Sequence, residues 1–273
     1  MFTTGRAPES ILETMALATT APLRAPRAGS ARRMRLDLED GARTTIHVAV
    51  HDTVATELRV AVFRAQAKLE AWCAANGVEE AIVGGFFARP LGTPLGEVRT
   101  HGVAREHVPF TAPFDAVRAC VHVDGGVAAI VSRTELPAAP RGDLLQAGPL
   151  LVRDGRPVFR REEDREGFRA ANGQFDSDIT DGRYPRAAIG LGEDRMFAVA
   201  VDGRSKADAG LTLEELAALM TALGAHTAMN LDGGGSTSLI SGGRLRNRPR
   251  AGFNLPEPGG RPVSTALLFV PRT

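Results

Sequence analysis

Residues 229–239 of this chain read Met229-Asn230-Leu231-Asp232-Gly233-Gly234-Gly235-Ser236-Thr237-Ser238-Leu239. Three consecutive glycines stand between an aspartate and a pair of hydroxyl side chains, and apolar, strand-like residues flank the segment on both sides. Ordering glycine costs more conformational entropy than ordering other residues, so a folded domain keeps such a run for a backbone reason. One reason is a loop whose N–H groups receive an anion. The alternative is a tight strand-to-strand turn in which glycine supplies positive φ.

A helix is predicted immediately before this segment. Thr212 and Glu215 have the spacing of a capping box, and Gly224 is the expected stop at the C-terminal end. The apolar residues between these signals recur with helical spacing. This helix delivers the chain into the strand that precedes the glycines.

The rest of the chain alternates short apolar stretches with polar, Pro- or Gly-containing turns. This pattern favours an α+β fold, with mixed, largely antiparallel sheets packed with a few helices. We predict one domain over 36–273, preceded by a poorly ordered Arg- and Ala-rich tail over 1–35 with a short helix around Ser10–Ala18. A charged stretch at 160–183 has no clear periodicity and is interpreted as a surface excursion or a mobile loop. A second helix is expected over 65–76, and strands are expected at 44–50, 57–63, 80–87, 118–123, 127–131, 146–153, 187–190, 196–201 and 265–270.

The composition excludes several classes of function. The formal net charge is +1, so bulk attraction to nucleic acid or anionic lipid is not indicated. No window approaches the roughly 18 apolar residues that a membrane span requires, and the tail has no apolar core of a secretory signal. We therefore expect a cytoplasmic protein without nucleic-acid or membrane partners. Cys73 and Cys120 lie in apolar stretches and are predicted to be reduced core thiols.

Several short motifs resemble those of the phosphodiester glycosidase family. Each motif alone is weak, but all occur in the family's order over about residues 80–270. The resemblance implies a hydrolase that acts on a sugar–phosphodiester bond. It rests on Gly84–Phe87, Gly148–Leu151, Tyr184–Gly190, Ala200–Arg204, Gly210–Ala217 and Asn230–Thr237.

Two positions depart from the family pattern. Family members usually carry Asn before the Gly-Gly of the first motif, where this chain has Val83. They also tend to carry Thr after the Pro-Arg pair, where this chain has Ala187. If that Asn orients a sugar hydroxyl in family members, valine cannot replace it, and an altered or lost activity is then the alternative.

The chemistry of a sugar-1-phosphodiester directs attention to arginines and carboxylates. A phosphate monoester departs easily, so catalysis must mainly neutralise its charge, stabilise an oxocarbenium-like centre and activate water. Arginine is suited to bind phosphate in a bidentate manner. We predict Asp232 as the first catalytic carboxylate and Asp202 as the second. The expected substrate-binding residues are Arg186, Arg204, Asn230, Gly233, Gly234, Gly235, Ser236, Thr237, Gly84 and Gly85.

Structural interpretations compete with some of these roles. Asp202-Gly203 follows an apolar strand and could be only a hairpin turn. Glu215 matches a family glutamate, but its place in the capping box favours a structural role. Arg186 could be a surface charge, and Asn230 could simply satisfy backbone groups near the turn.

No metal or cofactor is expected, because the six histidines lack zinc spacing and no P-loop, dinucleotide fingerprint or Gly-x-Ser-x-Gly elbow appears. The expected partner is a small phosphorylated sugar or a nucleotide sugar. Two alternatives stay open. One is a non-catalytic module that binds a phosphosugar or nucleotide, and the other is a biosynthetic enzyme acting on a phosphorylated intermediate.

Overall fold

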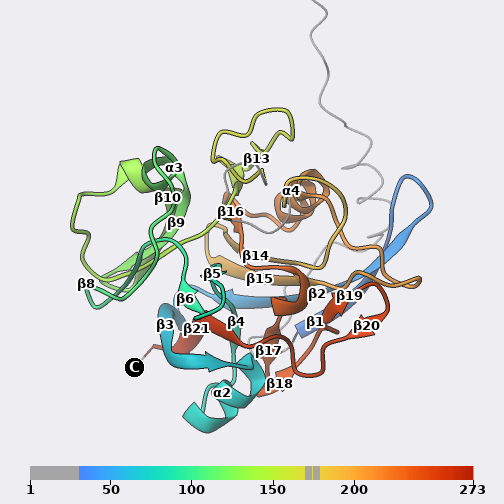
Figure 1. Cartoon of the computed structure of the whole chain (residues 1–273), viewed down its shortest axis with the longest axis horizontal. Coiled ribbons are helices and arrows are strands. Elements are labelled where there is room, and N and C mark those ends of the chain that lie inside the picture. The colour runs from blue at the N-terminus through green and yellow to red at the C-terminus, as the bar shows by residue number, and fades with distance from the viewer. Residues whose placement is uncertain (1–30, 170–173, 175–178, 273) are drawn as a thin grey trace, which may run out of the picture.

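The computed structural model describes residues 31–169, 174 and 179–272 (Figure 1). Most of the predicted tail, with its short helix, lies outside these residues. Residues 31–35 were predicted to belong to the tail, but they form the start of the first strand, β1 (Ala31–Asp37). The reason is tertiary, because β1 pairs with β2 along its whole length and gains its hydrogen bonds there. None of the helices in the described ranges is both long and apolar enough to cross a lipid bilayer.

A seven-stranded antiparallel sheet forms the centre of the fold, in the order β1-β2-β15-β14-β16-β12-β13. Its side chains alternate between two apolar clusters, as expected for a sheet that is covered on both faces. In β15, for example, Val199 and Val201 face one cluster, whereas Ala198 and Ala200 face the other. Its remaining strands are β2 (Arg43–Asp52), β12 (Leu150–Arg153), β13 (Arg156–Pro157), β14 (Arg186–Leu191), β15 (Arg195–Val201) and β16 (Thr227–Asn230).

Helix α4 (Leu213–Ala222) covers one face of this sheet, as Figure 1 shows. Its predicted capping box is confirmed, because Glu215 N donates to Thr212 Oγ1 at 3.1 Å and Thr212 N donates to Glu215 Oε2 at 2.8 Å. The apolar side chains of the helix pack into the same cluster as Val199. Gly224 follows with φ of 93°, which is the left-handed stop that the sequence predicts.

Two smaller sheets cover the other face. One has the order β18-β17-β4-β21-β3 and the other β10-β9-β11-β7-β8, and every pairing in both is antiparallel. The first contains β3 (Thr56–Ala67), β4 (Ala81–Val83), β17 (Leu239–Ser241), β18 (Arg244–Leu245) and β21 (Val263–Pro271). The second contains β7 (Val98–Thr100), β8 (Val103–Ala104), β9 (Ala119–Asp124), β10 (Val127–Ser132) and β11 (Asp143–Gln146).

Two short hairpins and two small helices complete the described elements. The hairpins are β5 (Phe87–Ala88) with β6 (Thr93–Pro94), and β19 (Arg250–Gly252) with β20 (Leu255–Pro256). The helices are α2 (Leu69–Asn76) and α3 (Phe114–Val117), and two single 3-10 turns lie at Arg133–Glu135 and Gly234–Ser236. Helix α2 starts later than predicted, because β3 continues to Ala67 in its ladder with β21.

The α+β assignment is therefore right in outline, in a fold that strands dominate. Cys73 and Cys120 are buried free thiols, as predicted. The stretch at 160–183 is more than a surface excursion in its described parts. Phe168 is 1% exposed, because it packs in a cluster with Phe86 and Phe110.

Candidate active site

The register of the central sheet brings the predicted site residues to one of its edges. Arg186, the first residue of β14, lies opposite Val201, the last residue of β15. Strand β16 also runs antiparallel to β14, so its last residue, Asn230, ends at this same edge. The loops that follow β15 and β16 therefore place Arg204 and Asp232 beside Arg186.

A pocket of about 560 Å³ opens at this edge. The structure brings seven of the predicted site residues to its wall, namely Arg186, Arg204, Asn230, Asp232, Gly233, Gly234 and Gly235. Five others do not line it, namely Asp202, Ser236, Thr237, Gly84 and Gly85. The volume is within the range usual for small-molecule sites.

The three glycines of the loop serve different steric purposes. Gly234 has φ of 60°, in the left-handed region that side chains other than glycine rarely adopt. A Cβ at Gly233 would lie 2.9 Å from the carbonyl oxygen of Pro185, and a Cβ at Gly235 would lie 3.2 Å from Nη2 of Arg261. The loop is therefore not a simple strand-to-strand turn, because it gives space to guanidinium groups and to a neighbouring segment.

Two of the glycine N–H groups that were predicted to bind an anion are instead hydrogen-bonded within the protein. The N–H of Gly233 donates to Oδ1 of Asp232 at 2.9 Å, and the N–H of Gly234 donates to the carbonyl oxygen of Pro185 at 2.9 Å. These two donors hold the loop in shape. The positive charge that binds an anion in this pocket must therefore come mainly from side chains.

Asp232 is the single carboxylate among the described residues that line the pocket. Burial raises its pKa to about 6, against the opposing effects of the nearby Ser236 hydroxyl, of Arg261 and of its bond from Gly233. Its backbone N–H donates to the carbonyl oxygen of Gly84 at 3.0 Å, which fixes the loop on the end of β4. A carboxylate with this pKa can exchange a proton near neutral pH.

Arg204 and Arg261 flank the glycines with their guanidinium groups. The Nη1 atom of Arg204 lies 3.2 Å from the position that a Cβ on Gly234 would occupy. The Nη2 atom of Arg261 lies at the same distance from the Cβ position of Gly235. In the described part of the chain, neither guanidinium has a carboxylate within ion-pair distance. Burial lowers the pKa of Arg204, and the positive charge of Arg261 lowers it further. Two mutually repelling cations in one pocket favour an anionic ligand.

Arg186 has a mixed role. It is 3% exposed, and three of its nitrogens donate to the carbonyl oxygens of Leu211, Ile179 and Gly182 at 3.0–3.1 Å. Burial lowers its pKa to about 10. It is not a surface charge, because it ties the pocket wall together while adding positive charge to it.

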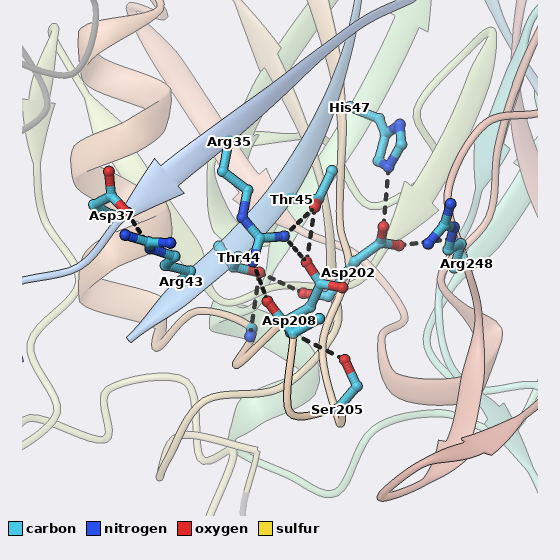
Figure 2. A network of polar contacts seen from close by, with 12 residues as sticks. Arg35, Asp37, Arg43, Thr44, Thr45, His47, Asp202, Ser205, Asp208 and Arg248 are labelled. Atoms are coloured by element: carbon cyan, nitrogen blue, oxygen red, sulfur yellow. Dashed lines mark hydrogen bonds and ion pairs between the residues drawn. The ribbon is translucent and has the colours of Figure 1, made fainter. Parts of the chain in front are cut away.

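Asp202 lies outside the pocket, in the polar network drawn in Figure 2. Its Oδ2 is 3.1 Å from Nε2 of His47, and its Oδ1 accepts the backbone N–H of Arg248 at 2.6 Å. The residue is 2% exposed. The geometry therefore does not support the predicted catalytic role, and it does not show the alternative hairpin turn either, since β15 continues through a loop to α4.

The same network fixes the loop that carries Arg204 (Figure 2). At the far end of this loop, Oδ1 of Asp208 accepts from Arg35 Nη1 at 2.8 Å and from Thr45 Oγ1 at 2.7 Å. Arg204 stands between Asp202 and Asp208 with φ of 55°, a conformation uncommon for a residue with a side chain. The hydrogen bonds of Asp202 on one side of Arg204 and of Asp208 on the other hold this conformation.

Asn230 lines the pocket and has one buried polar atom without a partner in the described structure. Its Nδ2 donates to the carbonyl oxygens of Gly148 and Leu231, at 3.0 and 2.8 Å, which leaves the buried Oδ1 without a partner in the described structure. The predicted hydroxyls lie behind the glycine loop instead, where Ser236 and Thr237 are fully buried. Gly84 likewise supports the loop from behind and contacts Thr265 too closely to carry a side chain.

The two departures from the family pattern do not touch the pocket. Val83 and Ala187 are both 0% exposed, and both belong to the apolar core between the sheets. Neither side chain lines the pocket in this chain.

Sequence reasoning did not select Arg89, Tyr184 or Arg261 as site residues, although all three line the pocket. The Tyr184 ring lies 5.2 Å from the guanidinium carbon of Arg186 and 5.6 Å from that of Arg204. A signal for Arg261 exists in the Gly-Gly pair that precedes it, but nothing local connects it to Asp232. Among the described residues, no group of three or more His, Cys, Asp or Glu side chains is placed to hold a metal ion.

A family model described as phosphodiester glycosidase matches residues 76–270, which is more than half of the chain. The chain belongs to the phosphodiester glycosidase family. The resemblance seen in the sequence motifs is thereby confirmed. No curated protein matches the chain.

Several solved structures share the fold of this chain at low sequence identity. The catalytic domain of zebrafish N-acetylglucosamine-1-phosphodiester alpha-N-acetylglucosaminidase, auto-inhibited by its pro-peptide, is 18% identical, with a TM-score of 0.66 over 89% of this chain and 83% of that one. A hypothetical protein from Synechocystis is 19% identical, with a TM-score of 0.60 over 89% of this chain. The match spans 62% of the Synechocystis chain. A candidate exported protein from Burkholderia pseudomallei is 17% identical, with a TM-score of 0.61 over 85% of this chain and 74% of that one.

Proposed function

We propose that this chain hydrolyses a sugar-1-phosphodiester, with Asp232 as its catalytic carboxylate and Arg204 and Arg261 as ligands of the phosphate. One observation carries the proposal. A single carboxylate with a pKa of about 6 shares a pocket with two guanidinium groups that lack carboxylate partners in the described structure. Membership of the family supports the reaction class.

The proposed reaction breaks the bond between the anomeric carbon and the phosphate oxygen. Water adds to the anomeric carbon, the phosphate leaves as a monoester, and Asp232 takes the proton of the attacking water. Because a phosphate monoester is a stable anion, the leaving group needs charge neutralisation more than a proton. This accounts for a pocket wall with several arginines and one carboxylate, instead of the two carboxylates that most glycosidases use.

Other wall residues assist in this proposal. The Oδ1 of Asn230, unpartnered in the described structure, accepts a hydrogen bond from a sugar hydroxyl or from the attacking water. Arg186 adds positive charge while it fixes the wall. Asp202 takes no part in the chemical step and positions the Arg204 loop.

Proton and phosphorus NMR of the purified protein with a panel of sugar-1-phosphodiesters and nucleotide sugars tests the proposal. We expect free sugar and a phosphomonoester to appear together, at a rate about 10²- to 10⁴-fold lower in Asp232→Asn. The matched control is Asp202→Asn, which changes a carboxylate outside the pocket. Unchanged turnover in Asp232→Asn would contradict the proposed catalytic role of Asp232. Ligand binding by a folded protein without any turnover would instead indicate a phosphosugar-binding module.

A further inference from the structure

Tyr184 is the single tyrosine of the chain, and it lines the pocket beside the proposed phosphate ligands. The residue is half-buried. Within the described part of the chain, no hydrogen bond joins its hydroxyl to another residue. The pocket wall therefore contains a phenol whose polar end is available to a bound molecule.

The backbone of Tyr184 is fixed at this place by its neighbours. Its N–H donates to the carbonyl oxygen of Leu211 at 3.2 Å, and the N–H of Leu211 donates back at 3.1 Å. A Cβ on Gly210 would collide with the carbonyl group of Tyr184, so glycine there permits the close approach. The following carbonyl, that of Pro185, accepts the N–H of Gly234 at 2.9 Å. Tyr184 is thereby connected through one residue to the glycine loop.

The ring of Tyr184 lies beside two guanidinium groups. Its centroid is 5.2 Å from the guanidinium carbon of Arg186 and 5.6 Å from that of Arg204. Both distances are within the range of cation–π attraction. The two arginines repel each other, since they carry like charges in one pocket wall. The ring therefore stabilises a pair of cations that would otherwise be unfavourable together.

A neutral hydroxyl at this place is suited to an anion. A phenol can donate one hydrogen bond, and hydrogen bonds to a charged acceptor are roughly twice as strong as those between neutral groups. Because the hydroxyl carries no charge, it adds a donor to the pocket without adding to the repulsion between the arginines. A further guanidinium in the same place would increase that repulsion.

We propose that the hydroxyl of Tyr184 donates a hydrogen bond to the substrate phosphate beside the guanidinium of Arg204, which makes Tyr184 a third ligand of that phosphate. The inference rests on the proposed function, since it concerns how the same pocket binds the phosphate. The ring and the hydroxyl then have separate tasks. The ring holds the arginines together, and the hydroxyl selects ligands that present an anionic oxygen.

Calorimetric titration with inorganic phosphate tests the inference without turnover. Tyr184→Phe keeps the ring and loses only the hydroxyl, so its affinity for phosphate should be about 10- to 100-fold lower than that of the wild-type protein. The matched control is Thr221→Val, which removes a hydroxyl outside the pocket and should keep the wild-type affinity. Equal phosphate affinity in Tyr184→Phe and the wild-type protein overturns the inference, as does a folded wild-type protein that binds no phosphate.

The single tyrosine also permits a direct measurement on the unchanged protein. An isotope label on the Cζ carbon of tyrosine gives one NMR signal in this chain, and that signal should move as inorganic phosphate is added. A signal that stays in place while phosphate binds overturns the inference.

Steady-state kinetics separate failure of this inference from failure of the proposed function. If the hydroxyl binds the phosphate equally well in the substrate and in the transition state, Tyr184→Phe raises KM for a sugar-1-phosphodiester and leaves kcat nearly unchanged. Phosphate binding through Tyr184 without hydrolysis of any ester supports the inference and contradicts the proposed function. Hydrolysis with the same KM in both proteins does the reverse. A fall in kcat at constant KM overturns the phosphate-binding role and indicates proton transfer by the phenol instead.

Discussion

The carboxylate of Asp202 faces His47, with Oδ2 3.1 Å from Nε2, and not the pocket that contains Asp232. Both aspartates follow strands of the same sheet, and both precede glycine in the sequence. One ends in a buried network and the other at the wall of a cationic pocket. This contrast is the reason for proposing a positioning role for Asp202 and a catalytic role for Asp232.

Replacing Asp202 should therefore affect stability more than chemistry. Asp202→Ala leaves the N–H of Arg248 and the ring of His47 without their buried partner, which should cost about 1–3 kcal/mol of unfolding free energy. Asp202→Asn keeps an acceptor and should retain kcat within tenfold. Urea unfolding and steady-state kinetics measure the two effects. A loss of kcat in Asp202→Asn as large as that in Asp232→Asn would contradict this assignment.

The pH dependence of kcat/KM should report Asp232. If the carboxylate accepts a proton from water, its charged form is the active one, so kcat/KM should fall as the pH is lowered through about 6. Arg261 lowers the pKa of this carboxyl, so Arg261→Gln should move the acidic limb to higher pH. A pH profile of the two proteins measures the shift. An acidic limb that stays in place would show that the profile reports another group.

Arg261→Gln should also weaken substrate binding. Hydrogen bonds to a charged group contribute about 1.5–3 kcal/mol, so KM for a phosphodiester should rise about 10- to 100-fold. The control is Arg141→Gln, because the Arg141 side chain is 86% exposed and lies outside the pocket. The inhibition constant of inorganic phosphate is a second measurement, because phosphate should inhibit more weakly in the Arg261 variant alone. Equal KM values in both variants would remove Arg261 from the phosphate site.

The glycine loop can be tested with a matched pair of variants. Gly155 in the β12–β13 turn has φ of 70° with open space around its Cβ position, and Gly234 has φ of 60° with Arg204 3.2 Å away. Gly155→Ala should cost only the left-handed backbone strain of about 1 kcal/mol. Gly234→Ala should cost at least as much and also displace the guanidinium, so KM should rise in this variant alone. Thermal unfolding and steady-state kinetics measure both quantities.

Glu166 should connect stability to pH. Its carboxylate accepts the N–H of Ala119 at 2.8 Å and that of Leu150 at 2.7 Å, and burial raises its pKa to about 7. A raised folded-state pKa means that the folded protein binds this proton more tightly than the unfolded chain does. The Glu166 contribution therefore favours folding as pH falls from about 7 towards 4.5 and is lost as pH rises through about 7.

Glu166→Gln removes this titration and leaves one backbone donor facing an amide nitrogen. We expect a loss of about 1–3 kcal/mol near pH 5 and a flatter dependence of unfolding free energy on pH. Urea unfolding between pH 5 and 8 measures both. An unchanged pH dependence would show that the proton is bound elsewhere.

Local signals were sufficient for much of the fold. The capping box of α4 and its Gly224 stop could be predicted, because caps depend on neighbours within a few residues. The same holds for the glycine loop, where the backbone requirement is visible as a run of glycines. The start of α2 could not be read in this way, since the ladder of β3 with β21 joins segments about 200 residues apart.

The sequence by itself determined the family, the positions of most strands and the choice of Asp232 and Arg204 for the pocket. Only the tertiary structure decided that Asp202 belongs to the His47 network and that Arg261 belongs to the pocket. The physical reason is that periodicity, caps and turns are local, whereas a side chain's environment depends on which distant strands pair. The register of β14 with β15 and β16 places three loops at one edge, and no local pattern encodes that meeting.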